Sequence, residues 1–252
     1  MGYSFSSRVR YSETGENGCL TLPGILDYFQ DTCTFQSESI NQGMLHLRQR
    51  NRAWVLGAWH VVVQRYPSLG EEILTQTIPY QFKGCMGLRN FIMQTPTGER
   101  LAWANSHWAN INTQTGMPVR LTEEDTRGYE LGTPLQWDFA PRRIRLPESG
   151  INQNILPEPE KGDPFQIQHH HLDSHRHVNN CQYVRMAMDY LPAGRTVSQL
   201  RVEYMHQALL GDTFYPFILN LPDRQYVLFQ IKPEWEADAY AVVELVFSDF
   251  LF

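Results

Sequence analysis

The chain has 252 residues, of which 42% are hydrophobic, and its formal net charge is −6. This length and apolar content predict a globular protein with a substantial core, and the acidic balance argues against broad nucleic-acid binding. No apolar run approaches the roughly 18 residues typical of a membrane span, and none near the start resembles a signal peptide, so we expect a cytoplasmic protein. The four cysteines lack CxxC spacing, which favours reduced thiols.

The first half of the sequence predicts one helix followed by several strands. Residues 22–40 place Leu22, Ile25, Leu26 and Phe29 on roughly one helical face. Runs typical of strands follow at 54–66, 72–79, 86–94 and 101–112, and Gly98 indicates a hairpin turn.

A proline-rich segment follows. Residues 121–160 hold five prolines and show little periodicity, so they predict a connection that crosses the surface. We therefore expect a first domain at 1–125, a linker at 126–160 and a second domain at 161–252.

The second half repeats the pattern of the first, which indicates an α+β fold built as a fused pseudo-dimer. Its helix is expected at 180–191, and its strands at 165–171, 197–206, 213–220, 226–231 and 239–247. Aligning Asp189-Tyr190 with Asp27-Tyr28 places Asp173, His175 and His177 opposite Tyr11, Glu13 and Gly15. A second match, at a smaller offset, aligns Gly211 with Gly70, so the first half carries about 21 extra residues between its helix and the following strand. Only the second half therefore carries the acid and the two imidazoles.

Residues 172–180, Leu-Asp-Ser-His-Arg-His-Val-Asn-Asn, form the most informative stretch of the chain. If the backbone is extended, Asp173, His175 and His177 point to one face. Asn179 or Asn180 is expected to begin a helix, because asparagine is a favoured N-cap. A carboxylate and two imidazoles beside a helix N-terminus have the groups needed to polarise a carbonyl and transfer protons.

Two other interpretations compete for these histidines. His169, His170 and His171 add three imidazoles and raise the hypothesis of a zinc site. Consecutive residues on a strand point to opposite faces and no HExxH spacing is present, so we expect no metal. A purely structural role for His175 and His177 is the second alternative.

The same stretch resembles the acyl-acyl carrier protein thioesterases, a plant and bacterial family of tandem hotdog domains. The resemblance extends to Tyr183, to Val202-Glu203-Tyr204 and to Leu210-Gly211-Asp212. In the first half it covers Trp54-Val55, residues 61–67, Gly70, residues 104–108 and Met117-Pro118. It therefore spans nearly the whole chain.

The resemblance implies a tandem (double) hotdog fold, each half an antiparallel sheet wrapped around one long helix. It also implies hydrolysis of fatty acyl-acyl carrier protein (acyl-ACP) to free fatty acid, in fatty acid biosynthesis and lipid metabolism, with no cofactor. The family's motif assigns catalytic positions to Asp173, His175, His177 and Gln207, with Asn179 and Asn180 at the substrate. His175 replaces the usual asparagine, and Gln207 replaces a plant glutamate and cannot act as a base. Glu203 is a weaker substitute, because strand parity places it on the same side as Gln207.

The acidic carrier protein is the expected partner, and it requires a basic landing patch on this acidic chain. We expect that patch at one of two arginine clusters, Arg48, Arg50 and Arg52 or Arg142, Arg143 and Arg145, although each is also compatible with an ordinary solvated surface. Hydrolysis of acyl-CoA and acyl binding without catalysis are the alternative functions. A homodimer remains open.

Overall fold

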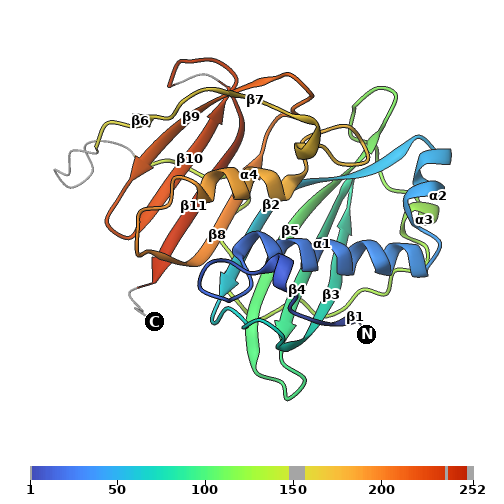
Figure 1. Ribbon diagram of the computed structural model, residues 1–252. Helices are drawn as coiled ribbons and strands as arrows, with labels where there is room; N and C mark the ends of the chain where they lie inside the picture. The colour runs from blue at the N-terminus through green and yellow to red at the C-terminus, as the bar shows by residue number, and fades with distance from the viewer. Residues whose placement is uncertain (1, 148–156, 236–237, 249–252) are drawn as a thin grey trace. The chain divides into compact units, whose positions relative to one another are not determined.

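The computed structural model describes residues 2–147, 157–235 and 238–248. The chain divides into two compact units, unit 1 at Met1–Ala140 and unit 2 at Pro141–Phe252. This division falls inside the segment expected as a linker, and the domain boundaries inferred from the sequence stay a prediction. Figure 1 shows one prominent helix lying over a sheet in each unit.

Unit 1 is a five-stranded antiparallel sheet in the order β1-β3-β4-β5-β2. Its strands are β1 (Tyr3–Arg8), β2 (Arg52–Val63), β3 (Glu72–Lys83), β4 (Met86–Gln94) and β5 (Arg100–Asn112). Its helices are α1 (Leu22–Ser39), α2 (Met44–Gln49), the short α3 (Glu123–Thr126) and the 3₁₀ helix η1 (Tyr11–Glu13).

Helix α1 confirms the predicted helix of the first half. The Thr21 side chain caps it by accepting a hydrogen bond from the Gly24 amide at 3.1 Å, and Pro23 lies in its first turn. Its apolar face is buried, and Phe29 packs on Trp59 and Phe91 with ring centroids 6.2 and 5.2 Å away. Helix α2, which the sequence pattern did not reveal, lies in the extra length between α1 and β2.

Unit 2 is a shorter version of the same plan, with the sheet order β8-β11-β10-β9-β6 and β7 paired to β9. Its elements are β6 (Glu160–Lys161), β7 (Phe165–Gln166), the 3₁₀ helix η2 (His169–His171), α4 (Asn180–Met188), β8 (Thr196–Tyr204), β9 (Thr213–Asn220), β10 (Arg224–Gln230) and β11 (Ala239–Ser248). The strand expected at 165–171 is wrong beyond Gln166, because residues 169–171 form η2.

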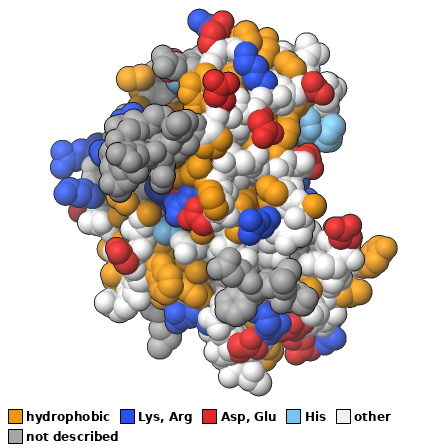
Figure 2. All heavy atoms as spheres, turned by 90° about the vertical axis from the view of Figure 1, so that its left-hand side faces the viewer, with side chains coloured by type: hydrophobic (Ala, Val, Ile, Leu, Met, Phe, Trp, Pro, Cys, Tyr) orange, Lys and Arg blue, Asp and Glu red, His pale blue; other side chains and the backbone are white. Residues whose placement is uncertain are grey.

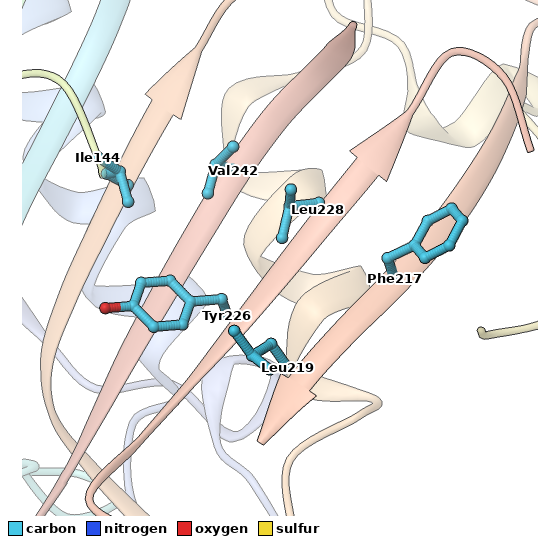
Figure 3. Close-up of a cluster of buried hydrophobic side chains, with 6 residues drawn as sticks. All are labelled: Ile144, Phe217, Leu219, Tyr226, Leu228 and Val242. Carbon is cyan, nitrogen blue, oxygen red and sulfur yellow. The ribbon is translucent and has the colours of Figure 1, made fainter. Parts of the chain in front are cut away.

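The sheet of unit 2 has a core on each face. On the face toward α4, Tyr183 packs with Phe214 and Phe229. On the outer face, a second buried cluster consists of Ile144, Phe217, Leu219, Tyr226, Leu228 and Val242, which Figure 3 shows in front of the strands with α4 behind them. Ile144 reaches this cluster from residues 141–146, the outer segment of unit 2.

Hydrogen bonds fix the outer segment to its sheet. The Ile144 amide donates to Glu203 Oε2 at 2.9 Å, and Arg201 donates to the carbonyls of Pro141 and Arg143. In unit 1, the Leu135 amide donates to Asn90 and the Ala140 amide to His60 Nδ1. The proline-rich connection is therefore bonded to each unit's own sheet on either side of residue 140.

In the part of the chain that the structure describes, no helix is both long and apolar enough to cross a bilayer.

Candidate functional site

Residues 172–178 form a tight hairpin turn, the site turn, so the extended backbone under which Asp173, His175 and His177 would share a face is not present here. Leu172 and Val178 pair as an antiparallel bridge, and the Asp173 amide donates to the His177 carbonyl at 2.8 Å. Arg176 closes the turn with φ of 63°, in the left-handed region. The sequence-based argument overlooked how readily an aspartate side chain binds nearby amides and so favours a turn.

The carboxylate of Asp173 holds the site turn together. Its Oδ1 accepts hydrogen bonds from the amides of His175 at 2.8 Å and His177 at 3.2 Å. Asp173 and His177 are half-buried, whereas His175 is exposed. The structure therefore brings Asp173 and His177 into one turn, with the carboxylate orientation fixed by the backbone.

The site turn leads directly into α4, which confirms the predicted helix start. Asn179 is the N-cap, and its side chain accepts from the Cys181 amide at 2.8 Å. The Asn180 carbonyl accepts from the Tyr204 hydroxyl at 2.8 Å. The Asn179 side-chain oxygen therefore caps the helix, and the positive end of the helix dipole lies beside the turn.

Gln207 lies in the segment 205–212, which follows β8 and borders the site turn. The Val178 amide donates to the Ala208 carbonyl at 2.9 Å, and Asp212 Oδ2 accepts from the Leu209 amide at 2.8 Å. Gln207 itself is exposed. The fold therefore places the Gln207 backbone beside the turn that carries Asp173 and His177.

The structure gives Glu203 a different environment from the one that strand parity predicts. Strand β8 ends at Tyr204, so strand parity does not extend to Gln207. Glu203 pairs in register with Val242 of the outer cluster and binds the Ile144 amide. Its carboxylate therefore lies on the sheet face away from α4. His206 is exposed beyond the strand's end.

Two tyrosines near the site were given no role by the sequence argument. Tyr183 is buried on α4, and this burial raises the pKa of its hydroxyl, although the backbone of Ala208 partly offsets the effect. Burial, and to a smaller extent the charge of Asp212, raises the pKa of Tyr240 to about 12. Both hydroxyls are neutral at physiological pH, and their aromatic positions in the sequence do not distinguish them from ordinary core residues.

The two arginine clusters differ in the structure. Arg50 and Arg52 pair with the fully buried Asp125, at 2.8 and 3.9 Å, while Arg48 is exposed. Burial alone would raise the pKa of Asp125, but hydrogen bonds from Thr122 and the two arginine charges lower it below the ordinary value. Two members of the first expected docking patch therefore have a structural task.

Arg142, Arg143 and Arg145 are all exposed and lie on the outer segment of unit 2. The backbone of this segment is held by Glu203 and Arg201, so the three side chains project from a fixed strip of chain. Figure 2 shows a compact group of Lys and Arg side chains at the left-hand edge of the face it presents.

The zinc hypothesis concerned the three histidines that form η2. Across 2–147, 157–235 and 238–248, no three His, Cys, Asp or Glu side chains are grouped so that they could hold a metal ion. The three consecutive histidines lie on a helical turn and not on a strand, with the His170 and His171 rings 4.0 Å apart.

Unit 1 contains the same turn. There the Gly15 amide donates to the Cys19 carbonyl at 2.9 Å, and the Gly18 amide donates to the Gly15 carbonyl at 3.0 Å. In unit 2 the Asp173 amide donates to the His177 carbonyl in the same way, and the Arg176 amide donates to the Asp173 carbonyl. The left-handed residue is Gly18, with φ of 72°.

These bonds correct the alignment of the two halves. Asp173, His175 and His177 correspond to Gly15, Asn17 and Cys19, not to Tyr11, Glu13 and Gly15. The Leu20 amide donates to the Pro67 carbonyl, as the Val178 amide does to the Ala208 carbonyl. Gly70 and Gly211 follow these two carbonyls at the same spacing, which agrees with their predicted match. The corrected positions in unit 1 hold neither an acid nor an imidazole.

Comparison with known proteins adds evidence for the family and the fold. The family model for the acyl-ACP thioesterase N-terminal domain matches residues 2–129. The chain is 24% identical over 208 residues to oleoyl-acyl carrier protein thioesterase 2, chloroplastic, of Arabidopsis thaliana, covering 76% of this chain and 55% of that protein. It is 24% identical over 216 residues to dodecanoyl-[acyl-carrier-protein] hydrolase, chloroplastic, of Cinnamomum camphora, covering 80% and 55%. The matches thus span about half the length of these curated relatives.

Solved structures match nearly the whole chain. An acyl-ACP thioesterase from Bacteroides thetaiotaomicron superposes with a TM-score of 0.83 at 18% identity, covering 97% of both chains. The 12:0-ACP thioesterase from Umbellularia californica superposes with a TM-score of 0.80 at 17% identity, covering 98% of this chain and 97% of that one. The predicted α+β tandem hotdog fold is confirmed.

Proposed function

Because the chain belongs to the acyl-ACP thioesterase family, we propose that it hydrolyses the thioester of fatty acyl-ACP and releases free fatty acid. One observation supports this proposal above the others: Asp173 and His177 share a hydrogen-bonded turn that leads into the N-terminus of α4. The carboxylate is fixed by two amides, and the helix dipole favours negative charge beside it.

In the proposed reaction, the thioester carbonyl lies at the start of α4, where the dipole stabilises the developing oxyanion. Two routes use the same residues. Either Asp173 attacks the carbonyl and forms a mixed anhydride that water then hydrolyses, or Asp173 and His177 remove a proton from an attacking water. In both, the C–S bond breaks, the phosphopantetheine thiolate takes up a proton, and the fatty acid leaves. No cofactor takes part.

The remaining predicted residues have supporting roles in this proposal. The Gln207 amide orients the attacking water, and the exposed imidazole of His175 supplies the hydrogen bond that asparagine gives in relatives of the family. Asn179 caps α4, so we infer that it contributes through the helix start, and Asn180 lies in the first turn beside the substrate.

We also propose that acyl carrier protein docks on Arg142, Arg143 and Arg145. These side chains are exposed and lie on a fixed segment, which suits recognition of an acidic partner. Arg50 and Arg52 are paired with Asp125, so Arg48 is the exposed arginine left in the other cluster. The cytoplasmic location and a homodimer stay predictions.

The deciding experiment measures free-thiol release from acyl-ACPs of graded chain length, with wild type, His177→Ala and the control His169→Gln. We expect turnover that His177→Ala lowers at least about 100-fold, the usual minimum for a lost acid–base group, without a change in melting temperature. His169→Gln should behave as wild type.

Each other outcome identifies an alternative. Binding of acyl-ACP without turnover at any chain length would mean that the chain is an acyl-binding hotdog protein, altered at His175 and Gln207. Turnover of acyl-CoA with none of acyl-ACP would make it an acyl-CoA thioesterase.

A further inference from the structure

His171 occupies the base of the site turn. Its backbone carbonyl accepts from the Asn179 amide at 2.9 Å, next to the bridge between Leu172 and Val178. Its side chain makes a second bond, in which Nδ1 accepts from the Gln168 amide at 2.9 Å. The residue therefore joins the incoming chain, the turn and the N-cap of α4.

The bond from Gln168 exists only while the imidazole is neutral. Nδ1 accepts the amide proton through its lone pair, and protonation of the ring replaces that lone pair with an N–H donor. The protonated ring would then face the Gln168 amide with two donors and no acceptor. An acid-sensitive hydrogen bond thus lies directly beneath the site turn.

Unit 1 shows the same clamp made with a different residue. There Glu13 Oε2 accepts from the Arg10 amide at 2.9 Å, and the Glu13 carbonyl accepts from the Thr21 amide at 3.0 Å. Glu13 and Thr21 thus correspond to His171 and Asn179. A carboxyl group keeps acceptor oxygens in either protonation state, whereas an imidazole loses its acceptor nitrogen on protonation. The clamp of unit 1 therefore lacks the acid sensitivity that the imidazole gives to that of unit 2.

We propose that His171 is a positioning residue whose neutral imidazole holds the site turn in place, and that its protonation loosens the turn and lowers thioester hydrolysis in mild acid. The effect on hydrolysis rests on the proposed function, whereas the opening of the clamp does not.

The surroundings of His171 set the direction of this response. Burial lowers the pKa of His171 below its ordinary 6.5, and the neighbouring His170 lowers it further. In the described part of the chain, His170 is the titratable group whose charge acts on the ring. A lowered pKa means that the folded protein keeps the neutral ring at physiological pH, and that the clamp opens only as the pH falls below 6.5.

The test follows amide hydrogen exchange of the 252-residue chain by NMR between pH 7.5 and 5. We expect the protection factors of the Gln168 and Asn179 amides to fall together in wild type, roughly fivefold, as for the loss of one hydrogen bond. In His171→Glu, which copies unit 1, both should stay protected. Constant protection in wild type, or equal losses in both proteins, would overturn the clamp.

The kinetic half of the test compares pH profiles of kcat/KM. We expect kcat/KM to fall further between pH 7.5 and pH 5 in wild type than in His171→Glu, with a difference of roughly fivefold at pH 5. The control His169→Gln should follow wild type, because the His169 side chain makes no hydrogen bond in the described part of the chain. Superimposable profiles for wild type and His171→Glu would overturn the link to hydrolysis. If the protein hydrolyses nothing, the exchange measurement still decides whether the clamp exists.

Discussion

Asp173 combines two tasks that are separable by mutation. Its carboxylate accepts two amides of the site turn, which is a folding task, and it is the proposed nucleophile or base, which is a chemical one. An asparagine side chain has the same shape and an oxygen acceptor, but no charge and little nucleophilicity. The two tasks therefore respond differently to substitution by asparagine and by alanine.

We expect Asp173→Asn to keep the turn and the melting temperature but to lower kcat by about 100-fold or more. Asp173→Ala should also destabilise the fold, by about 1–3 kcal/mol, because two amides lose their acceptor. Thiol release and thermal unfolding of both variants measure the two effects. Near-normal kcat in Asp173→Asn would show that the charge has no catalytic role.

At the residue level, the sequence identified the acid and imidazole but not their geometry. The pattern of alternate positions suggested an extended segment, because it contains no information about which amides the Asp173 carboxylate will bind. Glu203 was misplaced for a similar reason: parity holds only while the strand continues, and β8 ends at Tyr204. Local competition between side-chain and backbone hydrogen bonds decided both outcomes.

Among the elements, α2, β2 and α3 are tied together by a buried charge. Asp125 on α3 has a side chain with no exposed area, and it pairs with Arg50 just after α2 and Arg52 at the start of β2. Removing the carboxylate leaves two cations that are largely buried and have lost a partner, which is usually more costly than losing a surface ion pair.

We expect Asp125→Asn to lower the free energy of unfolding by about 3 kcal/mol at pH 7. Since the pKa of Asp125 is lowered on folding, its contribution is complete above about pH 4 and is lost as the pH falls further. The difference in free energy of unfolding between wild type and Asp125→Asn, measured by urea denaturation, should therefore narrow below pH 4. A gap that stays constant down to pH 3 would contradict the charge-based explanation.

The outer segment of unit 2 depends on β8 in a similar way. We expect Glu203→Ala to lower the free energy of unfolding by about 1–3 kcal/mol, because the buried Ile144 amide loses its acceptor. The kcat should not change, since this carboxylate lies on the sheet face away from α4. A fall in kcat at unchanged stability would return Glu203 to the list of catalytic candidates.

The starts of α1 and α4 were predicted correctly, and the reason is local. Thr21 and Asn179 both cap the helices they precede, so the helix starts follow from short-range chemistry. The run 165–171 has strand-like composition, but pairing with β9 ends at Gln166 and the next residues turn into η2. Strand length depends on partners that are distant in sequence.

Across the whole molecule, charge is unevenly distributed. The net charge is −6, yet three exposed arginines lie within four residues on the outer segment. An acidic carrier protein would be repelled by the average surface and attracted to this strip, and attraction of this kind mainly accelerates encounter.

We expect the combined substitution Arg142→Glu, Arg143→Glu and Arg145→Glu to raise KM for acyl-ACP by roughly tenfold at low salt, and to leave a small soluble thioester unaffected. The effect should shrink as salt screens the charges. Arg48→Glu, compared with each of the three single substitutions, is the control in the other cluster. Equal effects on both substrates would exclude a docking role for the strip.

The turn that unit 1 and unit 2 share gives the protein an internal reference. Each copy has a left-handed residue, a capping side chain before its helix and an acceptor below the turn, as in Gly18, Thr21 and Glu13. These features are what the backbone needs in order to adopt this shape. Unit 1 fulfils them with glycine where unit 2 keeps Arg176 in a less favourable conformation. Within one polypeptide, the duplicated turn thus separates the residues that folding requires from those left over for chemistry.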